Sequence, residues 1–414
     1  MIDFSFRSLL IRVVPWVVLL VGCGGAVERF LTKGEMGNRS QSVFQLESGR
    51  YCRISDAENK RSLRLNCASL VNFVRQSDSG CQRQSTFRPA LGWFPEREQP
   101  MRLCQGAMAL DVQPVDQLTF AVFGDSGRGE LASHGYHQQS VADAMLSVCR
   151  EGNRDQCRFA LIAGDLIYDD GVRDVWDRKF TLFFEKIYKK FGAMPFYGSP
   201  GNHDHKGNLI SLVEYSWFSD RWRMPHRWYN VPALPEWIKI SAIDTTEIIG
   251  EGEDKDAWRR QMEFLAGSFC QDHGEVFRLL FGHHPPRSGG KHGDQGDMQR
   301  FLAELYERCP FHIYFAGHDH HQEHIRVEED GYDVVIQGAG GTAIRGVEPY
   351  AGQRFARAAH GFSLVEARPK MLDLYFYEAP VRRGAAPLRR DDYLYHCRLV
   401  ADQPGGCLPV TEKP

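Results

Sequence analysis

The sequence lacks an excess of either charge. Its 414 residues include 50 Lys and Arg against 53 Asp and Glu, which gives a formal net charge of -3. Proteins that bind nucleic acid usually show a basic excess or a basic stripe, so a nucleic-acid polymer is not indicated as a partner. With 43% hydrophobic and 25% charged residues, the composition is that of a globular protein, and the length suggests two or three folded units.

A membrane-spanning run is lacking near the start. Residues 13–21 form an apolar run that is far shorter than the ~20 residues a spanning helix needs. Arginines before the run and small residues after it are the features of an export signal. The tetrad Leu-Val-Gly-Cys at 20–23 resembles the box at which bacterial lipoproteins are acylated. We therefore expect residues 1–22 to be a lipoprotein-type signal peptide and Cys23 to carry a lipid that anchors the protein to the cell envelope; an ordinary cleaved signal is the alternative.

The sequence also contains no Cys-x-x-Cys pair, so a thiolate metal site is not indicated. There are 11 cysteines, and removing Cys23 leaves an even number that can form disulfides, as in many exported proteins. Connectivity cannot be deduced from the sequence, although short loops favour Cys149 with Cys157 and Cys397 with Cys407. Cys270 could pair with Cys309 across two helices, while Cys52, Cys67, Cys81 and Cys104 could staple the N-terminal stretch.

The pattern of apolar and polar residues changes at about residue 115. Residues 23–114 carry no motif that we can assign, and their short alternating runs predict a small β-rich, disulfide-stapled module of unknown function. Residues 115–378 alternate strand-like runs with helical periodicity, which predicts a layered α/β domain that ends in antiparallel strands. Residues 379–414 are expected to be a C-terminal extension on the surface. The expected helices are residues 137–150, 175–191, 258–269 and 298–308.

Five of the strand-like runs end in a polar cluster that begins with glycine. The clusters are Gly-Asp at 124–125, Gly-Asp-Leu-Ile-Tyr at 164–168, Gly-Asn-His-Asp at 201–204, Gly-His-His at 282–284 and Gly-His-Asp-His at 317–320. Ligand sites of open α/β sheets form outside the carboxyl ends of the strands, and glycine permits a sharp turn there. One such cluster is typical of an ordinary turn, but five in this order predict one shared site.

This series of motifs resembles the metallophosphoesterase superfamily, and specifically its purple acid phosphatase branch. The similarity runs from about residue 117 to 342 and is greatest to the small, tartrate-resistant type, with Gly-Asn-His-Asp-His-Lys-Gly-Asn at 201–208 carrying much of it. Tyr168 is the discriminating residue, because other branches lack a metal-binding tyrosine there. The resemblance implies a four-layer α/β/β/α sandwich with a binuclear metal centre.

By this resemblance, seven side chains would bind two metal ions. The first ion would be held by Asp125, Asp165, Tyr168 and His320, and the second by Asp165, Asn202, His283 and His318. Anionic oxygen ligands that include a phenolate suit hard Fe(III) at the first site. One shared carboxylate, a neutral amide and two imidazoles suit a divalent ion at the second site: Fe(II), Zn(II) or Mn(II).

Two further histidines would act on the substrate. By the resemblance, His203 would hydrogen-bond the phosphoryl group, and His292 would protonate the leaving alkoxide as a general acid. A solvated loop histidine is the alternative for His292. We expect His284 behind the ligands or on the surface, and the acidic run at 247–256 to form a solvated surface.

The favoured function is that of an acid phosphatase. A metal-bound hydroxide would attack the phosphorus of a small phosphate monoester at acidic pH, without a covalent phosphoenzyme, since no nucleophile motif is present. A phosphodiesterase or nucleotide hydrolase on the same centre is the first alternative, because the motifs define the metal chemistry but not the ester. A surface binding protein with a vestigial metal site is the alternative of another class. The expected oligomeric state is a monomer.

Overall fold

The computed structural model describes residues 116–127, 136–151, 157–175, 177–216, 219, 221–272, 274–381, 386–401 and 403–411, together with the backbone of five strands that precede them. By its internal contacts the chain splits into two units, Met1–Leu110 and Asp111–Pro414. The boundary lies close to residue 115, where the pattern of apolar and polar residues changes in the sequence.

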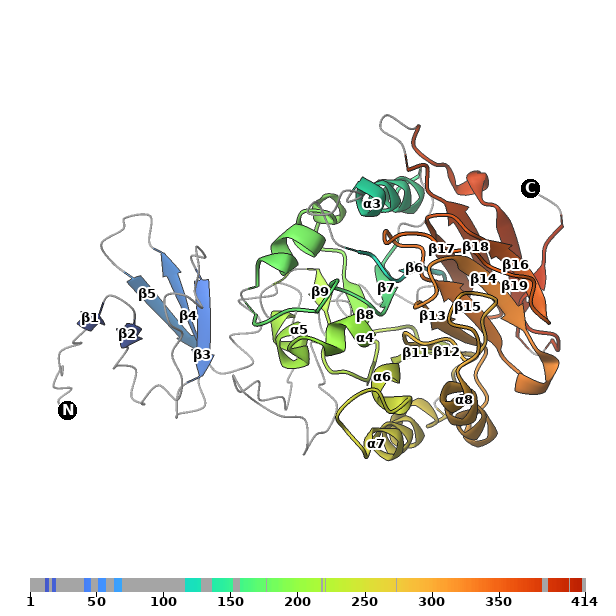
Figure 1. Cartoon of the computed structure of the whole chain (residues 1–414), viewed down its shortest axis with the longest axis horizontal. Coiled ribbons are helices and arrows are strands. Elements are labelled where there is room, and N and C mark those ends of the chain that lie inside the picture. Colours follow the sequence, from blue (N-terminus) through green and yellow to red (C-terminus); the bar gives the residue numbers. More distant parts are fainter. Residues whose placement is uncertain are drawn as a thin grey trace. The chain divides into compact units, whose positions relative to one another are not determined.

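The N-terminal unit contains short antiparallel strands (Figure 1). A hairpin is formed by β1 (Arg12–Val14) and β2 (Val17–Leu19), and a three-stranded sheet by β3 (Gln41–Gln45), β4 (Tyr51–Asp56) and β5 (Leu63–Ala68). The register of β4 with β5 places Cys52 opposite Cys67. The strands agree with a β-rich module, while Cys23 and the cysteine side chains of this unit lie outside the described residues.

The second unit is built on two mixed sheets. The eight-stranded sheet has the order β20 (Leu408–Pro409), β19 (Tyr395–Val400), β18 (Met371–Glu378), β17 (Gly361–Arg368), β6 (Leu118–Phe123), β7 (Phe159–Ala163), β8 (Phe196–Ser199), β9 (Trp222–Arg223). The seven-stranded sheet has the order β10 (Tyr229–Asn230), β11 (Ile238–Ala242), β12 (Phe277–Phe281), β13 (Ile313–Ala316), β15 (Asp333–Gln337), β14 (Gln322–Arg326), β16 (Gln353–Arg357). Strands β6 to β9 are parallel in the first sheet, and β11, β12, β13 and β15 in the second.

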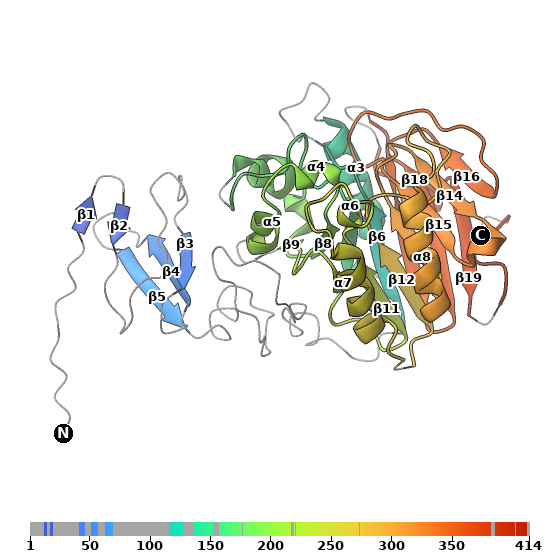
Figure 2. The same ribbon diagram turned by 60° about the horizontal axis from the view of Figure 1, so that its bottom comes forward.

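Helices cover these sheets. The α-helices of the unit are α3 (Tyr136–Cys149), α4 (Asn202–His205), α5 (Leu209–Tyr215), α6 (Thr245–Ile248), α7 (Ala257–Phe264) and α8 (Gly296–Arg308). Figure 2 shows α7 and α8 side by side against the seven-stranded sheet. In α8, Met298, Phe301, Leu302 and Leu305 are buried, the spacing of one apolar helix face, and they join a core cluster with Leu280 and Tyr314 of the sheet. The predicted mixed α/β fold with two sheets is therefore confirmed.

The segment expected as one helix over residues 175–191 is irregular. It contains a π-helical turn, η4 (Phe180–Glu185), and a 3-10 turn, η5 (Lys189–Phe191). The rings of Phe180 and Phe184 pack against Trp222 with centroids 5.3 and 5.0 Å apart. We attribute the wider turn to this aromatic packing, since tertiary contacts override a local helical pattern. The other short turns are η6 (Leu265–Phe269), η7 (Glu328–Asp330) and η8 (Arg390–Asp392).

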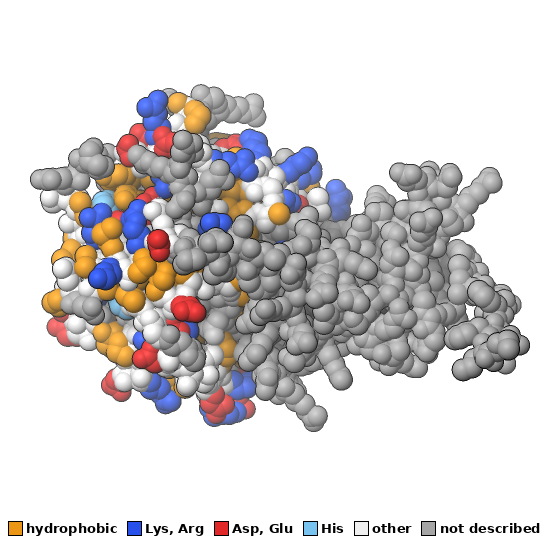
Figure 3. All heavy atoms as spheres, turned by 180° about the vertical axis from the view of Figure 1, so that it is seen from behind, with side chains coloured by type: hydrophobic (Ala, Val, Ile, Leu, Met, Phe, Trp, Pro, Cys, Tyr) orange, Lys and Arg blue, Asp and Glu red, His pale blue; other side chains and the backbone are white. Residues whose placement is uncertain are grey.

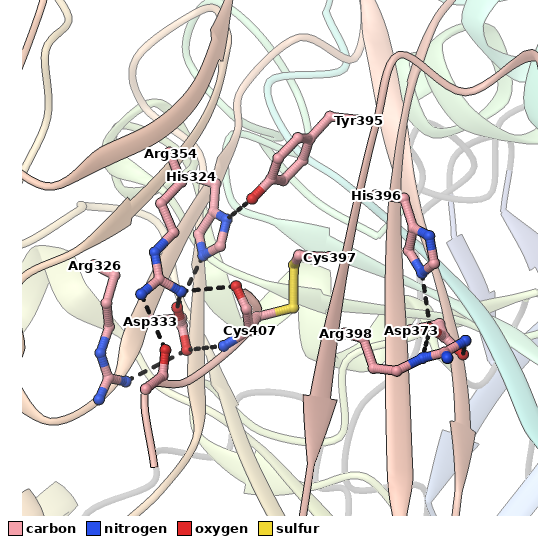
Figure 4. Close-up of a disulfide and its surroundings, with 11 residues drawn as sticks. His324, Arg326, Asp333, Arg354, Asp373, Tyr395, His396, Cys397, Arg398 and Cys407 are labelled. Carbon is pink, nitrogen blue, oxygen red and sulfur yellow. Dashed lines mark hydrogen bonds and ion pairs between the residues drawn. A yellow bond between two sulfur atoms is a disulfide. The ribbon is translucent and has the colours of Figure 1, made fainter. Parts of the chain in front are cut away.

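The C-terminal segment is part of the folded unit. Strand β19 pairs antiparallel along β18, so residues 395–409 complete a sheet instead of forming only the surface extension expected for residues 379–414. Figure 4 shows how this segment is held. The Cys397–Cys407 disulfide closes its loop, the Cys407 N–H donates to buried Asp333 at 3.0 Å, and Arg354 donates to the Cys407 carbonyl oxygen at 2.7 Å. The cost of burying the charged Asp333 carboxylate beside this loop is offset by several hydrogen bonds.

The two disulfide pairs favoured by short loops and the pair expected across two helices are confirmed. Cys149–Cys157, Cys270–Cys309 and Cys397–Cys407 have Cα–Cα distances of 5.0, 5.4 and 5.3 Å, within the range that a disulfide requires. Such bonds are typical of proteins that fold in an oxidising compartment.

The described surface has no single sign of charge. Figure 3 shows basic and acidic side chains interspersed over the coloured part of one face, as expected from the balanced composition. Among the helices that the structure describes, none is both long enough and apolar enough to cross a bilayer.

Candidate metal centre

Five strand ends meet at one site. Asp125 follows β6, Asp165 and Tyr168 follow β7, and Asn202 and His203 follow β8 in the eight-stranded sheet. From the seven-stranded sheet, His283 follows β12, and His318 and His320 follow β13. Asp125, Asp165 and His283 are fully or almost fully buried, and their ligand atoms lie within 4.8 Å of one another. The structure thus brings the predicted clusters together.

The backbone at this edge is unusual. Asp125, Asp165 and His318 have φ values of 52°, 48° and 68°, in the left-handed region that non-glycine residues rarely adopt. Two glycines allow the close approach of neighbouring loops. A Cβ on Gly164 would lie 2.3 Å from His283 Nδ1, and one on Gly201 would lie 2.3 Å from Asp165 Oδ1. Such strain is characteristic of functional sites.

The predicted first-site ligands contact one another. The Tyr168 hydroxyl donates to Asp125 Oδ1 at 2.7 Å and lies 3.2 Å from His320 Nε2. His320 Nε2 is 3.3 Å from the same carboxylate oxygen. The other ring nitrogen, Nδ1, donates to the carbonyl oxygen of Ala343 at 2.9 Å, which leaves Nε2 as the atom available to a metal.

The predicted second-site ligands surround His283 Nε2. This atom lies 3.0 Å from Asn202 Oδ1, 3.2 Å from His318 Nδ1 and 3.4 Å from Asp165 Oδ1. His283 Nδ1 donates to the carbonyl oxygen of Ala163 at 3.1 Å, so the same argument makes Nε2 the ligand atom. Asp165 therefore lies between the two groups, as a bridging ligand would.

Electrostatics of the protein alone favour a bound cation. Burial raises the pKa of Tyr168 well above its ordinary value, and the charges of Asp125 and Asp165 raise it further. Burial would also raise the pKa of Asp125, but the hydrogen bond from His320 and the nearby imidazoles lower it overall. Burial and the neighbouring imidazoles lower the pKa of His318, which keeps that ring neutral. Burial lowers the pKa of His283, but the charges of Asp165 and Asp125 raise it overall. Buried carboxylates beside imidazole nitrogens form a donor set that fits a pair of metal ions.

Asp204 holds two of the loops together. Its carboxylate accepts hydrogen bonds from the N–H groups of Leu166 at 2.9 Å, Ile167 at 3.0 Å and Gly201 at 2.9 Å. Burial, followed by the charge of Asp165, raises the pKa of Asp204 to about 7. In the sequence, Asp204 is visible only as part of the Gly-Asn-His-Asp motif. Its contact with the loop after β7 joins distant parts of the chain, so no local pattern predicts it.

His203 lies at the mouth of the centre. Its backbone N–H donates to Asp165 Oδ1 at 2.9 Å, and its ring packs on Tyr168 with centroids 4.3 Å apart. His203 Nδ1 donates to the carbonyl oxygen of Asp169 at 2.6 Å. The side chain of His203 is 25% exposed, so the second ring nitrogen can reach a substrate.

His292 also lies at the mouth. Its ring is tilted against that of His318 with centroids 4.1 Å apart, and its backbone N–H donates to Asp319 Oδ1 at 3.1 Å. Arg345 Nη1 donates to His292 Nε2 at 2.5 Å. Burial lowers the pKa of His292; Asp319 opposes this shift, while Arg345 and Lys291 add to it. The structure thus brings His292 to the site and adds a guanidinium that the motifs did not reveal.

The structure decides one expectation for a neighbouring residue and revises another. His284 is buried, with 2% of its surface exposed, which agrees with the first of its two expected positions, behind the predicted ligands. Part of the acidic run is also buried: Arg227 contacts Glu247 at 2.5 Å and Asp254 at 3.5 Å. Together with buried Asp244, which lies 3.4 Å from Arg227, these carboxylates neutralise a guanidinium in the interior.

Comparison with known proteins agrees with the site. The family model for calcineurin-like phosphoesterases matches residues 118–322. Tartrate-resistant acid phosphatase type 5 of Oryctolagus cuniculus is 29% identical over 247 residues, which are 53% of this chain and 75% of that protein. Purple acid phosphatase 4 of Arabidopsis thaliana is 25% identical over 286 residues, 64% of this chain and 81% of that protein.

Among solved structures, GAP50, described as the anchor in the inner membrane complex of Plasmodium, has a TM-score of 0.57 at 19% identity, and the match covers 70% of this chain and 90% of that chain. At this identity the similarity concerns the fold alone. The sequence matches confirm the resemblance that the motif series indicated, whereas the role of each ligand stays a prediction.

Proposed function

Because residues 118–322 form a calcineurin-like phosphoesterase domain, we propose that this protein is an acid phosphatase that hydrolyses small phosphate monoesters with two metal ions. One observation carries the proposal: Asp125, Asp165 and His283, from three strand ends in two sheets, offer buried ligand atoms within 4.8 Å of one another. A fold of this kind hosts several functions, so the argument depends on the site.

The donor sets support different ions at the two positions. Asp125, Asp165 and Tyr168 would supply anionic oxygens to Fe(III), together with His320. Asp165 would be shared with Fe(II), Zn(II) or Mn(II), together with Asn202, His283 and His318. When bound, such a pair polarises phosphoryl oxygens and lowers the pKa of a coordinated water, which is the chemistry that hydrolysis at acidic pH requires.

His203 would bind the phosphoryl group. With Nδ1 already donating to the Asp169 carbonyl oxygen, a protonated His203 ring has Nε2–H left as a donor to a phosphoryl oxygen. Lys206 Nζ lies 3.4 Å from His203 Nδ1, and its charge would add to the attraction of the mouth for an anion.

His292 would protonate the leaving group. The His292 residue is exposed and its ring lies 4.1 Å from that of His318, so a leaving group on the solvent side of the centre could reach it. Arg345 currently donates to His292 Nε2, and a substrate oxygen is a better acceptor for that guanidinium than a neutral imidazole. Binding of an anionic substrate to Arg345 would therefore free the Nε2 lone pair, which would take up a proton from solvent at acidic pH and then donate it to the leaving alkoxide.

A phosphodiesterase or nucleotide hydrolase would use the same ligands, and the site geometry alone does not choose between these esters. A surface binding protein with a vestigial metal site is the remaining alternative, on which the likeness in fold to GAP50 has no bearing. Intact ligand positions argue against this alternative.

One activity profile tests these functions. The metal-loaded protein is assayed from pH 4 to 8 on an aryl phosphate, a nucleotide and an aryl diester. We expect the monoester to be hydrolysed with the highest kcat/KM at acidic pH. Preference for the diester would replace the proposal with the first alternative, and a protein that binds two ions yet hydrolyses none of the three would support the binding protein.

We further propose that the protein is exported and monomeric, with a lipid on Cys23 as its membrane anchor. The three disulfides of the second unit support export. Cys23→Ser should move the protein from the membrane fraction to the soluble fraction after expression in a bacterium. Unchanged partitioning would refute acylation at this residue.

A further inference from the structure

Two residues that are not candidate ligands connect the loops of the second metal site. Asp244 and Thr245 follow β11, and Thr245 begins α6. Both side chains are fully buried. The strand is a neighbour of β12 in the seven-stranded sheet, so the Asp244–Thr245 turn lies beside the loop that carries His283.

Thr245 is bonded to that loop through three contacts. Its Oγ1 accepts from the N–H of His283 at 3.2 Å and from the N–H of His284 at 3.0 Å. It also lies 2.8 Å from His284 Nδ1. A hydroxyl has two lone pairs and one proton. The two N–H groups use both lone pairs, so the proton is donated to His284 Nδ1, and every hydrogen-bonding position of the hydroxyl is filled.

His284 is held by the same hydroxyl through its Nδ1 atom. The ring packs against His318 with centroids 4.4 Å apart. Thr245 therefore sets the backbone of one ligand and the ring that supports another.

Asp244 is bonded to the loop after β8. Its Oδ1 accepts from His205 Nε2 at 2.8 Å, and His205 is the last residue of α4, whose first residue is Asn202. The backbone of Asp244 is fixed in turn: its N–H and its carbonyl oxygen each bond to the side chain of Gln261 at 2.9 Å. The turn is thereby held on α7, and one end of α4 is held on the turn.

We propose that the Asp244–Thr245 turn is a positioning element for the second metal ion, which sets the separation of Asn202 and His283. Those ligands come from different sheets, and their ligand atoms lie 3.0 Å apart. No comparable contact links the turn to Asp125 or Tyr168 among the residues that the structure describes. This proposal rests on the proposed function. It predicts that disrupting the turn lowers the affinity for the divalent ion and leaves iron binding unchanged.

The test uses the full-length protein and removes one hydroxyl. In Thr245→Val the side chain keeps its shape but two N–H groups and His284 Nδ1 lose their partner. Changing a residue that orients a ligand typically lowers metal affinity about 10- to 100-fold. We expect the affinity for Zn(II), measured by competition with a chromophoric chelator, to fall by that factor, while iron content by mass spectrometry stays at the wild-type level. Thr245→Ser, which retains the hydroxyl, should restore Zn(II) binding.

The neighbouring residue provides a matched control. Thr246 is 1% exposed, lies in the same helix, and its Oγ1 has no hydrogen-bond partner among the described residues. Thr246→Val should therefore leave Zn(II) affinity and iron content unchanged. An equal loss of Zn(II) in both valine variants would overturn the proposal, because the effect would then follow from the substitution and not from the bonds of Thr245.

A second variant keeps the test decisive if Thr245→Val does not fold. Asp244→Asn retains an acceptor for His205 but removes the charge, and we expect a selective loss of Zn(II) smaller than about 10-fold. Wild-type Zn(II) affinity in each folded variant, or an equal loss of iron and zinc, would refute the positioning role. Failure of the proposed function is a separate outcome: wild-type protein itself would then bind no second ion or hydrolyse no ester.

Discussion

Replacing Tyr168 with phenylalanine tests the assignment of the first metal ion. A tyrosine with an ordinary pKa of 10.0 costs about 7 kcal/mol to deprotonate at pH 5, because each pKa unit corresponds to about 1.4 kcal/mol. Burial and two carboxylates raise the pKa of Tyr168 further, so 7 kcal/mol is a lower bound. Only an ion with strong Lewis acidity can offset that cost, and this singles out Fe(III) among the proposed ions.

The perturbation therefore has two separable effects. Wild-type protein should bind Fe(III) with the release of one proton more than Tyr168→Phe, so the logarithm of its affinity should rise more steeply with pH, by one unit per pH unit. It should also be purple or pink from phenolate-to-iron charge transfer, and the variant should be colourless. The assay combines iron affinity at several pH values between 5 and 8 with the visible spectrum. Equal pH slopes, or a coloured variant, would refute the phenolate ligand.

Other consequences of the site and the fold can be measured directly. Asp165→Asn should lower the affinity for both metal ions by more than the roughly 10- to 100-fold that is typical when a residue hydrogen-bonded to a ligand is changed. Retention of one ion at full occupancy would exclude a bridging role. Arg345→Gln removes a cation beside His292. Burial lowers the pKa of His292 most, and Arg345 is the first of the charges that lower it further, so the pKa should rise in the variant. The high-pH limb of the kcat profile should then move to higher pH, and a shift in the opposite direction would contradict His292 as the acid. Replacing Cys397 and Cys407 with serine opens a loop with a sequence separation of 10, for which chain entropy gives about 3 kcal/mol of stability. An unchanged free energy of unfolding in urea would show that strand pairing and the hydrogen bonds of Asp333 and Arg354 hold the segment without the disulfide.

The grouping of the predicted ligands at one site could be inferred from the sequence because each follows a strand and a glycine within a few residues. Asp165 and Tyr168, for example, belong to one loop, and their spacing is a local property of the chain. Thr245 could not be predicted in the same way. Its role depends on hydrogen bonds to residues 38 and 39 positions away, and a threonine after a strand has no distinguishing pattern. The same holds for Arg345, which reaches His292 across 53 positions.

The limits of local pattern also explain the errors in the fold. The strand-like run at 118–123 is recognisable because all six residues are apolar or β-forming and all are buried, as in a central strand covered on both faces. The two-residue strands β9, β10 and β20 are too short to show alternation. Strand β19 follows an arginine-rich stretch, whose polar character favoured the prediction of a surface extension. The place of β19 beside β18 depends on strand pairing, which the local sequence does not show.

The division of the ligands between the sheets connects the fold to the proposed chemistry. Asp125, Asp165, Tyr168 and Asn202 follow strands of the eight-stranded sheet, whereas the three histidine ligands follow strands of the other. Each ion would therefore bind across the junction of the sheets. The protein already has hydrogen bonds there, since the His318 N–H donates to Asp125 Oδ2 at 2.8 Å and His283 Nδ1 donates to the Ala163 carbonyl oxygen. These bonds position the loops before an ion arrives, so metal binding need not supply the ordering free energy that a small metal-dependent domain requires. The buried charges at the junction, which are costly in the metal-free protein, are then the part of the site that an ion stabilises.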